Sequence, residues 1–366
     1  MIQDSFLKSF RETKSPFIMN PFRFAAAGGG GVGGWVELGR TTLGSASVDI
    51  DVTGLADKRY YMYLIDAKFN DTNPRDLRMQ TGNGSFDTGS NYAERRSHNG
   101  GTDATGTSGT FVTALNSLGI AVPAFGVGYT SNKSDKEKLF QHHFVHQNTA
   151  GAGTAPARNE CVWKWANTSN SLDRLKVTRT STYQFSSGSE VVVLGWDPAD
   201  THTDNFWEEL ASVELSSAGD LLDTGTFTAK KYLWVQLYVS TTGGAVSQRL
   251  TFNSDTGSNY AQRRSADGGS DATGASGVNI DGFNDDLVTS SAGFTNFFIV
   301  NNSANEKLGI VHAISQEAVG AGTVPTRDEG VLKWANTSSQ ITRLTFTNNK
   351  AGDMGTNTTL KVWGSD

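Results

Sequence analysis

The sequence predicts an all-β protein with two tandem homologous antiparallel β-sandwich domains, jelly-roll-like in type, after an N-terminal anchor peptide and a Gly-rich linker. Three observations support this fold class. One long segment occurs twice in the chain. Short stretches rich in aromatic and β-branched residues alternate with clusters of Gly, Asn, Asp, Ser and Thr, as in sandwiches and jelly rolls. No stretch has the period of a long amphipathic helix or a coiled-coil heptad.

The duplication is visible in two blocks that return in the same order. Residues 87–109, DTGSNYAERRSHNGGTDATGTSG, return as DTGSNYAQRRSADGGSDATGASG at residues 255–277, with 18 of 23 positions identical. GAGTAPARNECVWKWANTS, from Gly151, returns as GAGTVPTRDEGVLKWANTS from Gly320. Solenoid units run to about 20–50 residues, so an offset of 168 to 169 residues indicates a whole domain present twice.

The expected strands follow in the same order in both copies. The first strand begins at Trp35, and its counterpart in the second copy begins at Trp207. The later pairs share aromatic and β-branched residues, which favour strands. These pairs are 58–67 with 230–239, 137–146 with 306–315, 174–180 with 343–349, and 190–196 with 359–366.

The expected domain boundaries follow from these repeated segments. We assign residues 1–34 to an anchor segment with an Ala/Gly-rich linker, 35–200 to the first copy and 201–366 to the second. The glycine run before Trp35 is typical of a flexible linker. The segment ahead of it is too apolar for a purely solvating tail, and we expect it to dock on a partner. Its candidate anchor residues are Phe6, Phe10, Phe17, Phe22 and Phe24.

Composition excludes several classes of protein. The net charge is −6 and the basic residues are dispersed, which is not the pattern of a nucleic-acid binder. The single cysteine, Cys161, excludes an intramolecular disulfide framework. No apolar run approaches the roughly 20 residues that span a bilayer, and the N-terminus lacks the apolar core of a signal peptide. We therefore expect synthesis in a host cytoplasm and no membrane insertion.

A histidine cluster, QHHFVH, raises the question of a metal site. On a strand His143 points away from His142 and His146, which lie about 13 Å apart along their shared face. Zinc needs ligands at about 2.0–2.1 Å, so the cluster predicts hydrogen-bonded core histidines instead. Only His143 has a histidine counterpart in the second copy, His312. We expect no metal and no cofactor.

The repeated DTGSNYA block contains the candidate contact residues. Its Asp and Asn residues have the oxygen ligands that calcium prefers, but their spacing matches no EF-hand, and Asx residues commonly hold turns. A structural corner is the favoured interpretation; an interface or a ligand site stays open as an alternative. The candidate contacts are Tyr92, Arg95 and Arg96 in the first copy and Tyr260, Arg263 and Arg264 in the second.

The KWANTS blocks place Trp165 and Trp334 at a second repeated corner. A tryptophan buried between two sheets is favoured over an exposed sugar-stacking platform, because large aromatics dominate core energetics. No nucleophile elbow, zinc helix or P-loop appears, and Arg158-x-Glu160, repeated at Arg327-x-Glu329, predicts an ion pair. The sequence therefore predicts a protein that is not an enzyme.

The segment FNSDTGSNYA, from Phe252, resembles a turn found in structural proteins of tailed bacteriophages, especially marine ones. WVELGRTTL, KWANTS and the terminal VWGSD are similar to segments of the same proteins, and the resemblance covers roughly residues 35–366. It implies a virion component, such as a fibre, spike, tail-tip or head-decoration protein, exposed on the particle surface. The lead-in of the first copy, RMQTGNGSF, departs from the motif, so its loop is expected to be specialised.

These expectations lead to one favoured function and two alternatives. The favoured function is a homo-oligomeric virion appendage, with a trimer as the favoured oligomer. It is expected to dock on capsid, portal or tail proteins through residues 1–34 and to contact a host receptor or glycan. The first alternative is a tandem carbohydrate-binding module protein acting on cell-surface polysaccharide. The second is a polysaccharide-degrading enzyme, which needs paired carboxylates about 5–9.5 Å apart in a cleft.

Overall fold

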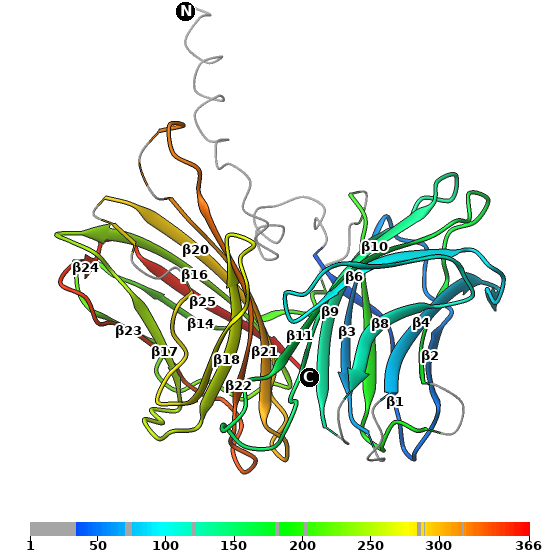
Figure 1. Ribbon diagram of the computed structural model, residues 1–366, viewed down its shortest axis with the longest axis horizontal. Coiled ribbons are helices and arrows are strands. Elements are labelled where there is room, and N and C mark those ends of the chain that lie inside the picture. The colour runs from blue at the N-terminus through cyan, green and yellow to red at the C-terminus, as the bar shows by residue number, and fades with distance from the viewer. Residues whose placement is uncertain are drawn as a thin grey trace, which may run out of the picture.

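The computed structural model confirms an all-β protein of antiparallel sheets (Figure 1). Within the described ranges the chain forms strands, turns and loops, and no helix long and apolar enough to cross a membrane occurs there. The expected anchor residues Phe6, Phe10, Phe17, Phe22 and Phe24 lie outside those ranges. The structure describes residues 34–69, 75–118, 122–179, 183–198, 200, 204–283, 287–288, 290–316, 318 and 320–366.

The strands of the first copy form two sheets. They are β1 (Val36–Thr42), β2 (Asp49–Thr53), β3 (Tyr60–Ala67), β4 (Arg75–Asn83), β5 (Ser85–Phe86), β6 (Tyr92–His98), β7 (Ala104–Gly109), β8 (Val112–Leu118), β9 (Ala124–Ser131), β10 (Lys138–His146), β11 (Ala157–Trp165), β12 (Arg174–Arg179) and β13 (Glu190–Trp196). The large sheet has the order β1-β13-β3-β9-β10-β11-β6-β7. The small sheet has the order β2-β12-β4-β5, with β8 beside β4.

The second copy repeats this topology. Its strands are β14 (Glu208–Glu214), β15 (Leu221–Asp223), β16 (Tyr232–Thr242), β17 (Gln248–Phe252), β18 (Tyr260–Ala266), β19 (Ala272–Gly277), β20 (Ala292–Val300), β21 (Lys307–Ser315), β22 (Thr326–Trp334), β23 (Leu344–Asn348), β24 (Asp353–Met354) and β25 (Thr359–Ser365). The large sheet runs β14-β25-β16-β20-β21-β22-β18-β19, with β24 beside β16, and the small sheet runs β15-β23-β17. Strand for strand, the large sheets match.

Each copy has its own core between its large and small sheets. Successive side chains of a strand point to opposite faces. In β3, Tyr61, Tyr63 and Ile65 therefore face the small sheet, where they are buried with Ile50 and Leu77. The second copy repeats this arrangement with Leu233, Val235 and Leu237 of β16. Each copy is thus a β-sandwich with a continuous apolar interior.

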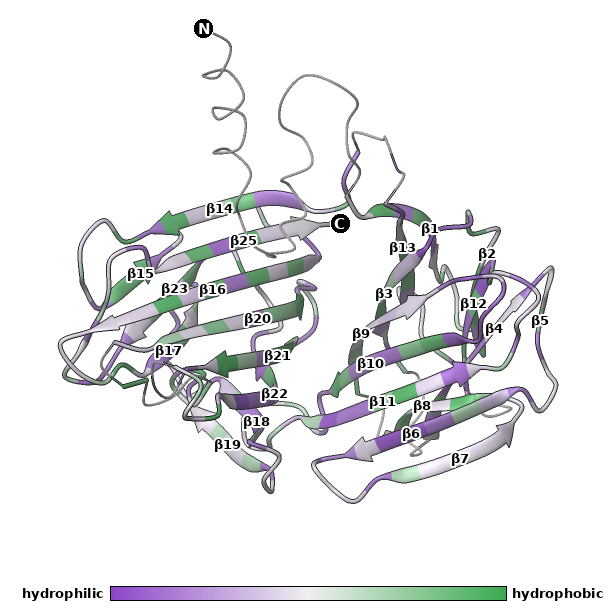
Figure 2. Ribbon diagram, turned by 90° about the horizontal axis from the view of Figure 1, so that it is seen from above, coloured by the Kyte–Doolittle hydropathy of each residue, from purple (hydrophilic) through white to green (hydrophobic). Residues whose placement is uncertain are grey.

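The other faces of the two large sheets pack against each other. Met62 and Leu64 of β3, which alternate with the core residues, join a third apolar cluster that also contains Trp234, Phe298 and Val300 of the second copy. Figure 2 shows the large sheets approaching each other where β10 and β11 lie near β21 and β22. This second packing explains why β3 is apolar at almost every position instead of alternating with polar residues.

Candidate functional site between the two sheets

The repeated DTGSNYA and KWANTS blocks meet at one corner of each sandwich. The Asp87 carboxylate accepts hydrogen bonds from the Trp165 indole at 2.7 Å, from the Gly89 amide at 2.8 Å and from the Asn91 side chain at 2.8 Å. Tyr92 lies in the core and its hydroxyl donates to the Asp87 carbonyl oxygen at 3.0 Å. The block therefore holds its own loop, with the aspartate oxygens already engaged.

The second copy builds the same corner. The Asp255 carboxylate accepts from the Trp334 indole at 2.7 Å and from the Gly257 amide at 2.8 Å, and Tyr260 is buried with its hydroxyl on the Asp255 carbonyl oxygen at 2.9 Å. Tyr92 and Tyr260 therefore face the interior, and a partner does not reach them. Trp165 and Trp334 are core residues, as the sequence predicted.

The four candidate arginines have different surroundings in the two copies. Arg95 is exposed and pairs with Asp103 at 3.1 Å, and Arg96 pairs with Glu94. Arg263 instead faces the first copy, where its Nε donates to the Pro156 carbonyl oxygen at 2.9 Å. Arg264 lies 3.6 Å from Asp328. Only Arg263 contacts an interface here, and that interface is internal to the chain.

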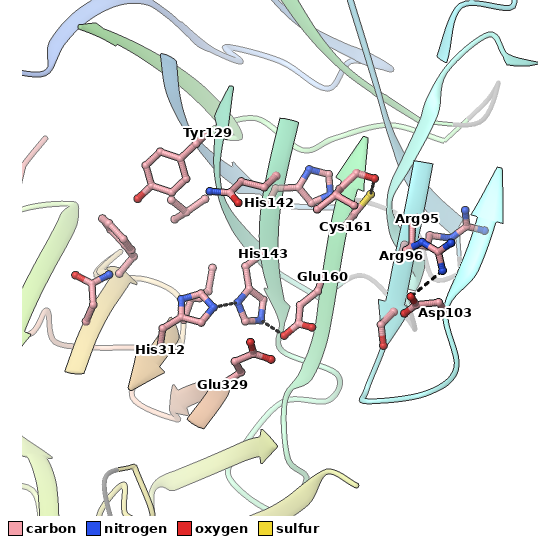
Figure 3. Close-up of a pocket in the computed structure, with 17 residues that line it drawn as sticks. Arg95, Arg96, Asp103, Tyr129, His142, His143, Glu160, Cys161, His312 and Glu329 are labelled. Carbon is pink, nitrogen blue, oxygen red and sulfur yellow. Dashed lines mark hydrogen bonds and ion pairs between the residues drawn. The ribbon is translucent and has the colours of Figure 1, made fainter. Parts of the chain in front are cut away.

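The two repeated histidines face each other across the sheets. His143 Nδ1 lies 3.0 Å from His312 Nε2 (Figure 3). His142 points the other way, into the first core, where its Nδ1 is 3.2 Å from the Tyr63 hydroxyl. Burial lowers the pKa of His142 to about 3 and that of His143 well below its usual value, so both stay neutral near neutral pH. Among the described residues, no group of His, Cys, Asp and Glu is arranged to hold a metal ion.

Beside the histidines lies a cluster of charged residues from both copies. The buried Arg158 guanidinium pairs with Glu160, with Asp271 at 2.7 Å and with Glu329 at 3.5 Å. Burial, together with the neighbouring carboxylate of Glu329, raises the pKa of Glu160 to about 7. Figure 3 shows Glu160 and Glu329 pointing toward the same space from β11 and β22. The Arg-x-Glu ion pair that the sequence predicted is present, and it extends across the interface.

His143 with His312, and Glu160 with Glu329, are contacts between equivalent residues. The contacts around them are not reciprocal, because Tyr232 is covered by the first copy while its equivalent Tyr60 is 37% exposed. The sequence identified both pairs as equivalent but gave no reason to bring them together. The available signal was only that the two members of each pair stand at one aligned position of the duplication.

The interface is closed on one side of these histidine and glutamate contacts. The Tyr232 hydroxyl donates to Glu190 at 2.8 Å, and Lys231 pairs with the same carboxylate at 2.9 Å. Lys333 is buried, and its ammonium donates to the carbonyl oxygens of Gln147 at 3.0 Å and Thr149 at 2.7 Å. The first copy thus covers the second at this end.

On the other side the sheets diverge and leave an open groove. We use "open groove" for the surface of the first copy between Trp35, Tyr60 and Trp196 at one end and Arg95 and Thr105 at the other. Its volume is about 1070 Å³, and an adjoining cavity of about 480 Å³ reaches His143, His312, Glu160 and Glu329. Sequence reasoning missed this groove because its walls come from strands far apart in the chain.

The exposed residues of the groove have buried counterparts. Tyr60, Leu139 and Val162 are 37, 58 and 51% exposed. Their equivalents in the second copy, Tyr232, Leu308 and Val331, are each 0% exposed, because the first copy covers them. The same surface is therefore used for internal packing in one copy and left open in the other.

Comparisons with known proteins add little to this geometry. No protein-family model matches the chain, and no curated protein matches it. Among solved structures, mouse laminin alpha1 chain, domains LG4-5, has a TM-score of 0.20 at 11% identity, covering 95% of this chain and 93% of that chain. A chain described under "Unveiling the Mechanism Behind the in-meso Crystallization of Membrane Proteins" has a TM-score of 0.12 at 11% identity, covering 75 and 82%. Scores this low carry no argument about function.

Proposed function

We propose that the protein is a non-enzymatic structural protein of a virion, a surface appendage that presents its two β-sandwiches as one rigid block and contacts a host-surface glycan. The observation that carries this proposal is the packing of the two large sheets. An apolar cluster joins the copies, and Arg158, Lys231 and Lys333 cross between them. A duplicated domain whose copies are joined in this way suits display on a particle surface and contact with a host glycan.

The sequence supports the particle assignment. The segments that resemble phage structural proteins, FNSDTGSNYA and KWANTS, form the two halves of the repeated corner held by Asp255 and Trp334. The resemblance therefore lies in residues that build the fold of the domain. It is the reason to place the protein on a virion.

The ionisable groups favour binding over catalysis. Glu160 and Glu329 form a carboxylate pair in the cavity, with a raised pKa at Glu160. Glycosidases separate their two carboxyl groups by about 5–9.5 Å to hold a sugar or a water between them. Here the two carboxylates interact directly and share Arg158. This arrangement suits an ion-pair network between the sheets.

The test is quantitative protein analysis of particles purified on a density gradient from the source culture. The proposal expects peptides of this chain to co-sediment with capsid protein at a fixed ratio through successive gradients. Peptides found only in cell or medium fractions would overturn it and favour the secreted tandem carbohydrate-binding module.

A further inference from the structure

The strand register places two rows of side chains across the open groove. Along each row, every residue pairs with the next one across the sheet, so all point to the same face. The first row is Trp196, Tyr60, Ser131, Leu139, Lys164 and Ala93. The second row is Leu194, Met62, Tyr129, Gln141, Val162 and Arg95. Its first two residues are buried in the apolar cluster that joins the copies, and the other four line the groove.

The same register in the second copy gives the corresponding rows. Val300 stands where the first copy has Ser131, Phe298 where it has Tyr129, and Ile310 where it has Gln141. Those three apolar residues pack against the first copy. The first copy thus carries a hydroxyl, a phenol and an amide at positions where the second copy carries only hydrocarbon.

This difference indicates what the open groove contacts. A dry contact between sheets favours apolar side chains, because a buried polar group without a partner costs free energy. Serine, tyrosine and glutamine side chains instead donate and accept hydrogen bonds. Tyr129 packs partly against the apolar cluster that joins the copies. Ser131 and Gln141 fit a hydroxylated ligand better than a second protein sheet.

The groove also offers flat aromatic surfaces. Tyr60 stacks on Trp196 with ring centroids 5.4 Å apart and planes at 19°. The ring centroids of Trp35 and Tyr129 are 6.3 Å apart. Binding sites are commonly lined by aromatic side chains with a few placed polar groups. A saccharide ring has one apolar face of C–H groups and a rim of hydroxyls. It can therefore stack on an aromatic ring while its rim bonds to Gln141 and Ser131.

The charges of the groove are paired within the protein. Arg95 pairs with Asp103 at 3.1 Å, Lys164 with Glu137 at 2.8 Å, and Glu94 with Arg96. A sulfated or carboxylated polysaccharide would need cations that are not already engaged with carboxylates. The ligand class that matches paired charges, aromatic faces and neutral hydrogen-bonding groups is a neutral saccharide.

We infer that the open groove of the first copy binds a neutral saccharide chain, with one site per protein chain. A tandem module would have two equivalent sites, but the first copy covers the corresponding surface of the second. This inference deepens the glycan contact of the proposed function. Its test uses purified protein, so a failure here leaves the virion assignment in place, and absence from particles leaves the groove in place.

The experiment is titration calorimetry of the full chain with gluco- and manno-configured neutral hexasaccharides, and with a sulfated hexasaccharide for comparison. The inference expects one neutral hexasaccharide to bind per chain, with little change in affinity between low and high salt. It is overturned if none of the neutral probes binds, if two bind per chain, or if the sulfated probe binds more tightly.

Two variants and a matched control locate the site. Tyr60→Ala removes the exposed ring and Gln141→Ile installs the second copy's residue; each is expected to weaken binding about tenfold. Tyr238→Ala removes a tyrosine of similar exposure, 41%, from the second copy and is expected to leave affinity unchanged. Equal losses for Tyr60→Ala and Tyr238→Ala would contradict the assignment. Thermal unfolding of each variant checks that the fold is retained.

Discussion

Single aspartates hold the repeated corners, and each corner can be tested in isolation. Asp87→Ala removes the acceptor for the Trp165 indole, the Gly89 amide and the Asn91 side chain. We expect a loss of about 1–3 kcal/mol in unfolding free energy, because a buried indole donor is left without its partner. Urea unfolding measures the loss. Asp103→Ala, which breaks only an exposed pair with Arg95, serves as the control and should cost under about 1 kcal/mol.

Glu160 gives a pH-dependent prediction at the same scale. Its pKa of about 7 in the folded protein lies above the ordinary value of 4.5 for a glutamate. Its contribution to stability is therefore complete below pH 4.5 and is lost as the pH rises through 7. Glu160→Gln should therefore stabilise the protein at about pH 8, by roughly 1 kcal/mol since a third of the side chain is exposed, and make no difference at about pH 4.

Thermal unfolding of this variant across pH gives the comparison. Glu137→Gln, which alters a surface carboxylate paired with Lys164, is the matched control and should show no such dependence. A destabilised Glu160→Gln protein at the higher pH would contradict the assignment.

Among the elements, β9 and β20 show how the two copies fill the same space differently. In the first copy, Gly126 and Gly128 leave room for the rings of Phe144 and Tyr63, which lie directly across from them on β10 and β3. In the second copy the pairs are reversed in size. Thr295 faces Ala313, and Phe297 faces Val235. The large group has moved from one strand to its neighbour.

This exchange predicts a coupling that a double-mutant cycle can measure. A Cβ at Gly128 would overlap the Tyr63 ring, so Gly128→Ala should cost about 1–3 kcal/mol. Adding Tyr63→Val, the residue of the second copy, should make the combined cost smaller than the sum of the two single changes. Gly44→Ala, whose Cβ would meet no atom within 4 Å, is the control. Additive costs at Gly128 and Tyr63 would show that the two positions are independent.

At the level of elements, the sequence predicted the fold class and the principal strands correctly. The runs 58–67, 137–146 and 190–196 became β3, β10 and β13, because aromatic and β-branched residues suit a pleated sheet. The order of strands within each sheet was not predictable, since neighbours such as β13 and β3 are joined by no local sequence signal. The duplication showed only that both copies share one topology.

At the scale of the whole molecule, the packing of the two copies buries four large aromatic rings of the second copy. Trp207, Trp234, Phe298 and Trp363 are buried, and they lie in the cluster that joins the copies. Expressed alone, residues 201–366 should expose these rings and associate with one another. Sedimentation analysis should then show dimers or larger species, and unfolding should begin at a lower temperature than in the full chain. A monomeric fragment of undiminished stability would contradict the interface.

The candidate site could be anticipated only in part from sequence. His143 was singled out as the one repeated histidine of its cluster, and it lies opposite His312 at the interface. The open groove was not anticipated, because its counterpart surface is buried and the two are nearly alike in sequence at Tyr60, Leu139 and Val162. The two surfaces differ because the first copy covers the surface of the second copy and not the reverse. This arrangement is a property of the whole folded chain.

Display on a virion, which we propose for this protein, is tested most directly with gold-labelled antibody against residues 201–366, imaged on particles and cells from the source culture. We predict gold at discrete points on particles, at a head, neck or tail position that repeats from one particle to the next. Label confined to cell surfaces, with particles bare, would contradict it.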